Sequence, residues 1–458
     1  MANYTATHPQ YDAALPGITK VRDFYLGAER VKSRRETYLP PPESIAITRA
    51  DEQVYRDKYA SYLCRAEVPA YVADAVERQT GMMHAKPPSI TLPPRLEYLR
   101  EDATGSGESL ANLLRSINAE QLLSGRVGLA VDVGPDGPVI RLYYAEAVRN
   151  WHAAGGQYSL VVLGEQHDTI GPDLVWESTP AYRVLTIGED GNYQTALYDA
   201  NGGQLDPLVT PSVMGRAYAG AVPFVAINCS DISPDMDRPP LLPLAEKCAA
   251  IYRLDADHKM HLHMQSASTL VVSGLIASES EQYDEDGNRI STQRKLRVGA
   301  GAYIETEIGG SAQYASPGAA GLAETREALD ALHRQAAAMG VDVLGAAGAG
   351  ESGDALTARV SARAASLVQI ARAGAAGLER ALRYCAIWVG ADPASVSVVP
   401  YTDYRVTPAS ASDALTLMQA KVIGAPISIR SIHEWAQANG FTRLDYSAEM
   451  DEIANEGP

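Results

Sequence analysis

The spacing of apolar residues predicts helices in the N-terminal part of the chain. Tyrosine, valine and leucine recur every three or four positions across 47–84, as on one face of a helix, and Pro87-Pro88 end the pattern. The segment 109–123 repeats it, with apolar residues at Leu110, Leu113, Leu114, Ile117 and Leu122. Ahead of these helices, the polar segment 1–43 ends in Pro40–Pro42, which predicts a stiff, extended connector.

Between Gly125 and Asn228 the pattern changes to that of β-structure. Short runs rich in β-branched and aromatic residues are separated by Gly, Asp, Asn and Pro. The runs are 127–133, 139–144, 159–163, 182–187, 193–198 and 222–227. The segments 189–192 and 199–202 have the composition of hairpin turns. Together these features predict an antiparallel β block.

Helical spacing returns after the β block and is interrupted by a small insertion. A helix is predicted over 241–263, because Leu241, Leu244, Cys248 and Ile251 lie on one face. The insertion that follows has β-like and turn-like runs. These are strands at 269–272, around 294–297 and at 303–308, with an acidic turn at 279–287.

The C-terminal part begins with two helices that flank a glycine- and alanine-rich loop. The helices are predicted over 322–339 and 355–389, and Gly374 and Gly377 predict a kink in the second. The loop, Gly340–Asp354, is rich in glycine and alanine, and its central stretch 345–350 carries no charge. Loops of this length inside a compact domain are usually functional or disordered. A strand at 396–399, helices at 411–422 and 428–439, and an acidic tail complete the chain.

Composition narrows the class of protein. The chain of 458 residues is 46% hydrophobic and 21% charged, the balance of a globular protein, and it is long enough for several domains. Its net charge of −17 disfavours nonspecific binding to phosphate backbones. The four scattered cysteines form no CxxC pair, so we expect reduced, buried thiols. We expect neither a signal peptide nor a membrane span.

No segment carries a recognisable catalytic signature. His258 and His261 would share a helical face, but His263 points away, so solvated or interface histidines are favoured over a metal site. The stretch 345–350 resembles a phosphate-binding loop only loosely, because no strand precedes it and no Gly-Lys-Ser/Thr follows. The basic runs 30–35 and 294–297 lack interleaved aromatic residues, which favours solvated faces over DNA contacts. The sequence therefore predicts a protein that is not an enzyme and has no cofactor or metal.

The order of the predicted blocks resembles that of the portal proteins of tailed bacteriophages. Local similarity covers four stretches within residues 20–440. They are Arg22–Lys32 with Tyr38–Pro40, Gly107–Leu110 with Leu123–Asp132, Tyr144–Trp151, and Pro223–Val225. The resemblance implies an α+β, portal-like fold with a mixed wing, a helical stem, a small α/β clip, a long kinked helix and a short helical crown.

The resemblance also implies a division of the chain. Residues 1–238 would form the N-terminal wing, and the remaining segments follow in order. These are a stem helix (239–268), the clip (269–318), a second stem helix (319–339), the tunnel loop (340–354), the long wing helix and strand (355–404), and a short crown or C-terminal tail (405–458).

A portal protein forms a ring at one capsid vertex, so the resemblance implies a homo-oligomer of about twelve subunits. Double-stranded DNA would pass through its channel during genome packaging and ejection. The implied partners are the terminase large subunit, a head-tail adaptor or tail protein, and the capsid and scaffolding proteins, with no membrane. The protein would be assembled in the host cytoplasm and reside in the virion.

Two groups of site residues follow from the resemblance. The DNA channel would be lined at the tunnel loop by Val341, Val343, Leu344, Gly345, Ala346, Ala347, Gly348 and Gly350. The clip residues that dock the motor or adaptor would be Asp284, Asp286, Arg294, Lys295 and Arg297. A loop of glycine and alanine has no long side chains to hold a phosphate, and it can deform easily.

Other classes stay open. A different virion structural protein, such as a head-tail adaptor, would share the acidity but would not need the helix–loop–long-helix unit. An enzyme with an unrecognised site is a second alternative, for which a ligand-induced thermal shift is the discriminating observation. A nucleotide-dependent assembly factor is a third, disfavoured by the missing Lys-Ser/Thr after the glycine loop.

Overall fold

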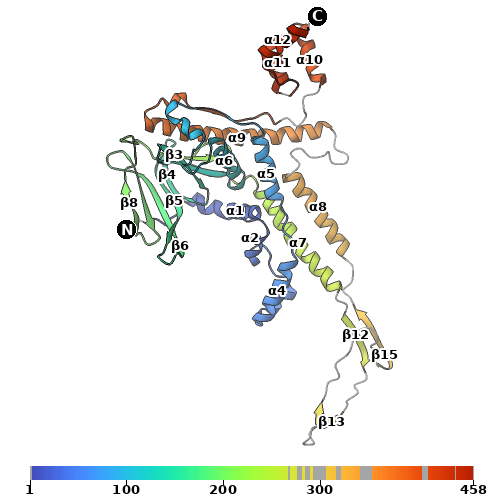
Figure 1. Ribbon diagram of the computed structural model, residues 1–458. Coiled ribbons are helices and arrows are strands. Elements are labelled where there is room, and N and C mark those ends of the chain that lie inside the picture. The colour runs from blue at the N-terminus through green and yellow to red at the C-terminus, as the bar shows by residue number, and fades with distance from the viewer. Residues whose placement is uncertain are drawn as a thin grey trace. The chain divides into compact units, whose positions relative to one another are not determined.

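The computed structural model describes residues 3–266, 269–275, 281–283, 289–291, 306–315, 321–340, 353–404, 411–438 and 440–456 (Figure 1). The chain divides into two compact units, Met1–Tyr401 and Thr402–Pro458, called unit 1 and unit 2 below. Helices and several small antiparallel sheets make a mixed α+β structure, which confirms the predicted class at that level.

The N-terminal helices lie where apolar spacing predicts them, with one addition. They are α1 (Pro9–Leu26), α2 (Ala28–Ser33), α3 (Glu43–Ala46), α4 (Glu52–Arg65), α5 (Tyr71–Met83) and α6 (Leu110–Ser124). The pattern does not predict α1. It starts at a His8 cap, whose Nδ1 accepts a hydrogen bond from the Gln10 amide at 3.2 Å. The extended backbone expected of the triple proline is confirmed at Pro42 (φ −63°, ψ 160°).

The β block is confirmed as antiparallel and divides into two sheets. One has the order β11 (Phe224–Asn228), β2 (Arg126–Val133), β3 (Pro138–Tyr144). The other runs in chain order through β4 (Val148–Ala154), β5 (Gln157–Ile170), β6 (Trp176–Ile187), β7 (Tyr193–Asp199) and β8 (Gln204–Val209). Short strands β9 (Ser212–Val213) and β10 (Arg216–Ala217) pair with each other. Both predicted hairpin turns are present, because the Gly188 and Asp199 amides donate across them.

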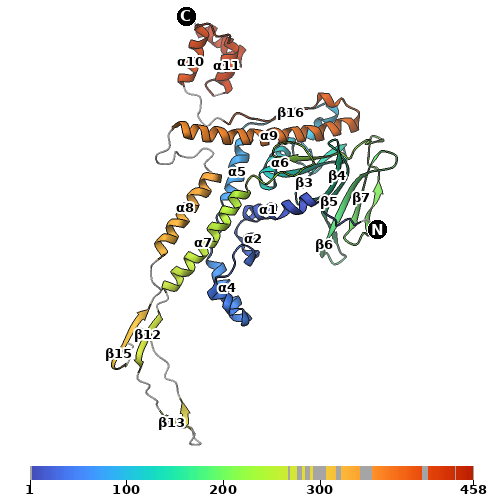
Figure 2. The ribbon, with the colours of Figure 1, turned by 180° about the vertical axis from the view of Figure 1, so that it is seen from behind.

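Two long helices follow and lie side by side (Figures 1 and 2). Helix α7 (Leu242–Ser266) leads into β12 (Thr269–Leu275), which pairs antiparallel with β15 (Thr306–Ala315), and α8 (Leu322–Gly340) follows β15. Between these strands, β13 (Glu281–Tyr283) pairs with β14 (Arg289–Ser291). Both helices are confirmed as predicted. Of the strand expected at 303–308, the described part, 306–308, lies in β15, and 303–305 lie outside the described residues. The strand expected around 294–297 lies outside the described residues.

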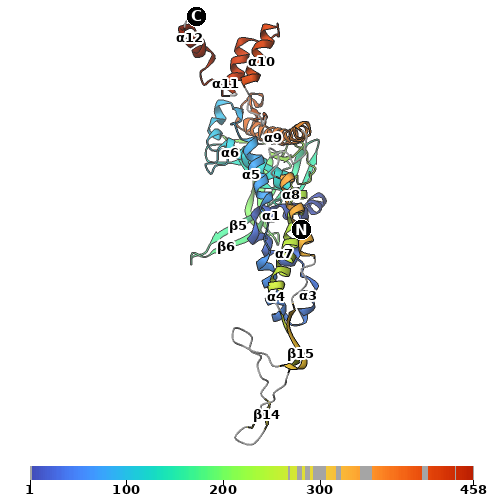
Figure 3. The same ribbon diagram turned by 90° about the vertical axis from the view of Figure 1, so that its right-hand side faces the viewer.

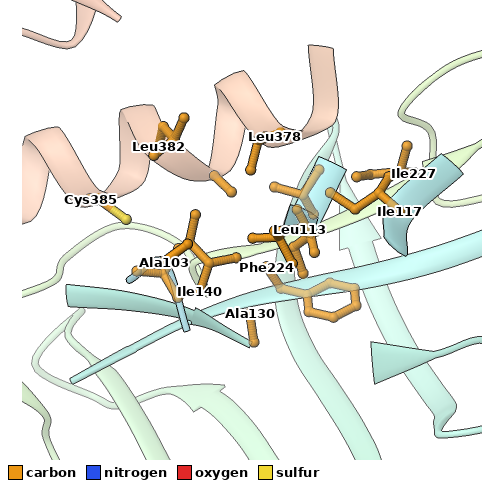
Figure 4. Packing of buried hydrophobic residues seen from close by; sticks show 14 of the residues in the cluster. Ala103, Leu113, Ile117, Ala130, Ile140, Phe224, Ile227, Leu378, Leu382 and Cys385 are labelled. Atoms are coloured by element: carbon orange, nitrogen blue, oxygen red, sulfur yellow. The ribbon is translucent and has the colours of Figure 1, made fainter. Parts of the chain in front are cut away.

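Helix α9 (Gly353–Val389) covers the three-stranded sheet and α6 (Figure 4). Leu378, Leu382 and Cys385 of α9 are buried in the core that includes Leu113 of α6 and Ile140 of β3. After α9, β16 (Ser397–Val399) confirms the predicted strand and pairs with β1 (Ser89–Thr91).

The two glycines at which the sequence predicts a kink lie within α9, which runs without a break from Gly353 to Val389. A Cβ atom at position 377 would lie 2.3 Å from Ile227, and one at position 374 would lie 2.4 Å from the Asn118 amide nitrogen. These glycines therefore allow α9 to approach β11 and α6 closely.

Unit 2 contains α10 (Ala411–Val422), α11 (Ile429–Ala438) and α12 (Tyr446–Glu456). The first two confirm the predicted helices, and α12 forms within the segment expected to be an acidic tail. Trp435 of α11 stacks on Phe441, with ring centroids 5.6 Å apart. The ring of His433 meets that of Tyr446 edge to face, at 5.5 Å.

The prediction that the cysteines are buried is partly wrong. All four thiols are free, but Cys64 is exposed, while Cys248 and Cys385 are buried. Cys64 lies near the C-terminal end of α4, whose buried residues are Tyr59 and Tyr62. In the described ranges, no helix carries an apolar stretch long enough to cross a bilayer.

Candidate functional site

Every predicted site residue lies outside the described part of the chain. This applies to the tunnel-loop residues Val341, Val343, Leu344, Gly345, Ala346, Ala347, Gly348 and Gly350. It applies equally to the clip residues Asp284, Asp286, Arg294, Lys295 and Arg297. The structure does describe the elements that precede and follow these segments, and it brings together the stretches that carry the family resemblance.

The α7–α8 pair connects the β12–β15 strands to the rest of unit 1. The first half of α7 is buried through Leu244, Cys248, Ile251 and Tyr252, whereas Leu262 and Met264 at its end are 46% and 45% exposed. Helix α8 is more open, because Ala336 is the one buried residue among those of α8 whose burial is described. The C-terminal end of α7 and most of α8 therefore have exposed surface that other molecules can contact.

Polar contacts hold α8 in place. The Tyr71 hydroxyl of α5 lies 3.0 Å from Nδ1 of His333, and Lys247 of α7 donates to Gln335 at 2.9 Å. Acids and bases are nearly balanced on both helices. On α7 they are Glu246, Asp255 and Asp257 against Lys247, Arg253 and Lys259, and on α8 Glu324, Glu327 and Asp330 against Arg326 and Arg334. The net acidity of the chain is therefore not concentrated on these two helices.

The histidine group at the end of α7 is open to solvent. His258 is half-buried, and His261 and His263 are exposed. Across the described residues, no group of three or more His, Cys, Asp or Glu side chains is placed to hold a metal ion.

Arg22, the first residue of the first resemblance stretch, joins three segments that are distant in sequence. Its guanidinium binds both carboxylate oxygens of Glu120 on α6, at 2.8 and 2.7 Å, and Oε1 of Glu146, ahead of β4, at 2.8 Å. Burial opposes the charge of Arg22, but hydrogen bonds to the two carboxylates outweigh it and raise its pKa. Burial raises the pKa of Glu120, and Arg22 only partly offsets this. The ion-pair cluster fixes α1 to α6 and to the sheet.

Asp23, the next residue, organises the turn after α1. Its fully buried carboxylate accepts hydrogen bonds from Nε of Arg30 at 2.7 Å and Nε of Arg34 at 2.8 Å. The buried Tyr38 hydroxyl also donates to it, at 2.8 Å. Burial raises the pKa of Tyr38, and the bond to Asp23 raises it further. Four residues of the first stretch, from Arg22 through Tyr38, thus have structural roles.

Arg126, in the second stretch, is fully buried at the start of β2. Its guanidinium carbon lies 4.2 Å from the ring centroid of Trp151, and His8 also stacks on Trp151, at 4.0 Å. Within the described residues its side-chain nitrogens have no hydrogen-bond partner. Burial lowers the pKa of His8, and the positive charge of Arg126 lowers it further. The cation–π contact with Trp151 therefore stabilises a charge that lacks an anionic partner.

The third and fourth stretches meet the second one in the same core. A Cβ at Gly128 of β2 would lie 2.7 Å from the Phe224 ring of β11. Trp151 belongs to the third stretch and Phe224 to the fourth. The stretches of resemblance thus build a joint between α1, α6 and the two sheets. The sequence pattern did not identify Glu120, which is the one carboxylate among the buried residues of α6.

Strands β5 and β6 extend beyond their sheet as a two-stranded arm (Figure 3). Pairing with β4 ends at Leu163 and pairing with β7 begins at Ala181, so among the described residues 166–170 and 176–180 pair only with each other. The tip of this β5–β6 arm exposes four large apolar side chains. They are Ile170 (51% exposed), Leu174 (76%), Val175 (56%) and Trp176 (69%). Clustered exposed apolar residues mark a contact surface.

A groove beside α6 is lined by Glu120, Asp132, Glu165, Arg141 and Arg183, among others. Arg183 pairs with Glu165 and Arg141 with Asp132, each at 2.7 Å.

Comparisons with known proteins give a partial family match and distant structural similarity. The family model described as "Domain of unknown function (DUF4055)" matches residues 240–389, which run from α7 to the end of α9. No curated protein matches the sequence. A chain from the "Neck of native GTA particle computed with C12 symmetry" is 15% identical, with a TM-score of 0.39, over 80% of this chain and 89% of that one. A chain from the "Neck of empty GTA particle computed with C6 symmetry" is 16% identical, with a TM-score of 0.40, over 81% and 90%.

Proposed function

We propose that the chain is a portal-type virion protein, which assembles as a closed ring at one capsid vertex and forms the channel for genome packaging and ejection. The observation that carries the proposal is the helix pair α7–α8, which bears the β12–β15 strands at one end and leads by 341–352 into α9. The described elements of this unit follow one another in the order that the resemblance implies for a first stem helix, clip strands, a second stem helix and the long helix, which supports the proposal.

In this role the division implied by the resemblance applies, with 239–268 and 319–339 as stem and 269–318 as clip. The clip would meet the terminase motor and later the head-tail adaptor. The tunnel loop, 340–354, would line the narrow part of the channel. The chain itself performs no catalysis, because ATP hydrolysis would belong to the separate motor protein.

The open surfaces of unit 1 support assembly. A ring is a heterologous assembly, so each subunit must present two different faces that complement each other. The half-exposed end of α7, the open faces of α8 and the apolar tip of the β5–β6 arm are surfaces that a monomer leaves uncovered. These three surfaces belong to different segments of the chain. Contacts to two different neighbours therefore explain them better than a single patch that binds a copy of itself.

The test of the proposal is direct. The purified full-length protein is expected to form a closed ring with a central hole, of about twelve copies, in negative-stain images and by mass photometry. Images that show only monomers or dimers at micromolar concentration would contradict the proposal.

Shortening the tunnel loop is expected to separate assembly from DNA handling. Deletion of Gly345–Gly350 removes six small residues, so ring formation should persist while packaging or retention of DNA falls. A length-matched control replaces the same residues with alternating Gly and Ser and should retain packaging. Loss of soluble protein on deletion would instead show that the loop is needed for folding.

A further inference from the structure

Residues 3–8, which precede α1, form a strap on the five-stranded sheet. Near the start of this strap, Tyr4 stacks on Tyr198 of β7, with ring centroids 4.0 Å apart. At its end, His8 stacks on Trp151 of β4, also with ring centroids 4.0 Å apart. Strands β5 and β6 lie between β4 and β7 in this sheet, so the strap joins strands that do not pair with each other.

The His8 ring holds the end of the strap in its neutral form. Its Nδ1 atom accepts the hydrogen bond from the Gln10 amide that caps α1, and an accepting ring nitrogen carries no proton. The His8 amide donates to the Arg149 carbonyl of β4 at 2.9 Å. Protonation of Nδ1 would place a donor against the Gln10 N–H and a positive charge at the N-terminus of α1. Both changes would break the cap.

A buried cation on the same aromatic ring also opposes protonation of His8. Arg126 of β2 is fully buried, and its guanidinium carbon lies 4.2 Å from the ring centroid of Trp151. Among the described residues, the side-chain nitrogens of Arg126 have no hydrogen-bond partner, so no bound carboxylate offsets their charge. Burial lowers the pKa of His8 from its ordinary value of 6.5, and Arg126 lowers it further.

The neighbouring acids offset this effect only in part. Asp235, ahead of α7, and Asp12 of α1 raise the pKa of His8, but the net shift is downward. Both carboxylates already accept hydrogen bonds, Asp235 from the Gln10 side chain at 2.8 Å and Asp12 from the Thr7 hydroxyl at 3.0 Å. A further charge on β4, the Arg149 guanidinium, lies over the ring of Tyr182 at 5.4 Å. A second positive charge at His8 is therefore unfavourable.

The start of α1 has anchors that do not involve the His8 ring. The Gln10 side chain accepts a hydrogen bond from the Met236 amide at 3.2 Å. The Tyr11 hydroxyl donates to the Glu146 carbonyl at 3.0 Å. Loss of the His8 cap would therefore free the strap and leave α1 docked on the sheet.

We propose that His8 is an acid-sensitive latch, whose protonation releases the strap from the sheet and uncovers one face of Trp151. The device belongs to unit 1 and does not depend on the proposed ring. A histidine with a lowered folded-state pKa leaves the folded contacts at full strength above its ordinary value of 6.5 and weakens them as pH falls through the folded-state value. The strap should therefore be closed at pH 7.5 and increasingly open below about pH 6.

Hydrogen–deuterium exchange of the full-length protein tests the latch, because the His8 amide is bonded to Arg149 only while the strap is closed. Mass spectrometry of the N-terminal peptide that contains 3–8 measures this exchange, corrected for the intrinsic pH dependence of amide exchange. We expect protection to fall by at least about threefold between pH 7.5 and 5.5, the change in equilibrium that a lost N-cap hydrogen bond produces.

Two substitutions of histidine by asparagine separate the latch from other effects of acid. His8→Asn keeps a capping side chain that cannot gain a proton in this range, so its protection should not change with pH. His152→Asn, at the exposed position after Trp151 on β4, is the matched control and should behave like the unaltered protein. An equal fall in His8→Asn and in the unaltered protein would overturn the latch, as would constant protection in the unaltered protein.

A third variant tests the part played by the buried cation. Arg126→Met keeps an apolar contact with Trp151 and removes the positive charge beside His8. Protonated His8 would then be repelled less, so the fall in protection between pH 7.5 and 5.5 should be smaller than in the unaltered protein. Circular dichroism checks that the variant is folded.

Discussion

Replacing Arg22 with methionine is expected to lower the free energy of unfolding of unit 1 by about 3 kcal/mol, the low end for a broken buried ion pair. The variant leaves Glu120 and Glu146 without the guanidinium that both bind. Glu120 is buried, so its charge would lose its partner without gaining water. Partial exposure of Glu146 keeps the loss at the low end. Urea unfolding followed by circular dichroism measures it.

The destabilisation by Arg22→Met should increase as the pH rises. Burial already raises the pKa of Glu120 above its ordinary value, and removal of Arg22 would raise it further. A carboxyl with a raised folded-state pKa favours folding below its unfolded-state pKa, and this contribution is lost as pH rises through the folded-state value. The destabilisation by Arg22→Met should therefore be small near pH 4 and full near pH 7.

Arg56→Met is the matched control, because Arg56 pairs with Glu52 on the exposed surface of α4. It should cost less than about 0.5 kcal/mol. Equal losses for Arg22→Met at the two pH values would mean that the lost packing of the Arg22 side chain, rather than its charge, stabilises the joint.

Gly377→Ala is expected to destabilise unit 1 by about 2 kcal/mol, although alanine is the better helix former. The added methyl group would lie 2.3 Å from Ile227, which is fully buried in β11, so α9 would have to move away from the sheet. Thermal or urea unfolding measures the loss. Gly81→Ala on α5 is the control, because no atom lies within 4 Å of its added Cβ. That variant should stabilise by roughly 0.5–1 kcal/mol.

A second substitution tests whether the close approach to Ile227 causes the destabilisation by Gly377→Ala. Ile227→Ala removes the atoms that the new methyl group would meet. The double variant should therefore lose at least about 1 kcal/mol less than the sum of the single losses. Strict additivity would show that the close approach of α9 to Ile227 is not the reason for the glycine.

The sequence predicts those elements whose buried side chains recur at a regular spacing. Helices α6, α7, α8 and α9 carry long apolar stripes, and all four occur close to their predicted bounds. Helix α1 was not predicted, because its buried residues are interrupted by Pro16, Gly17 and several charges. Strand β8 was missed for a different reason: all its residues are exposed, so no alternation marks it.

By itself, the sequence determined the order of helices and strands, the antiparallel β block, the helix–loop–long-helix unit and the absence of a recognisable catalytic motif. These are local properties, since apolar period and turn composition act over neighbouring residues. Tertiary structure alone decided which distant residues meet. Arg22 finds Glu120 and Glu146, and Gly377 admits Ile227, because packing joins residues that are 98, 124 and 150 positions apart in the sequence. A charge or a glycine has no intrinsic preference for a partner that far along the chain, so only the folded core could assign these roles.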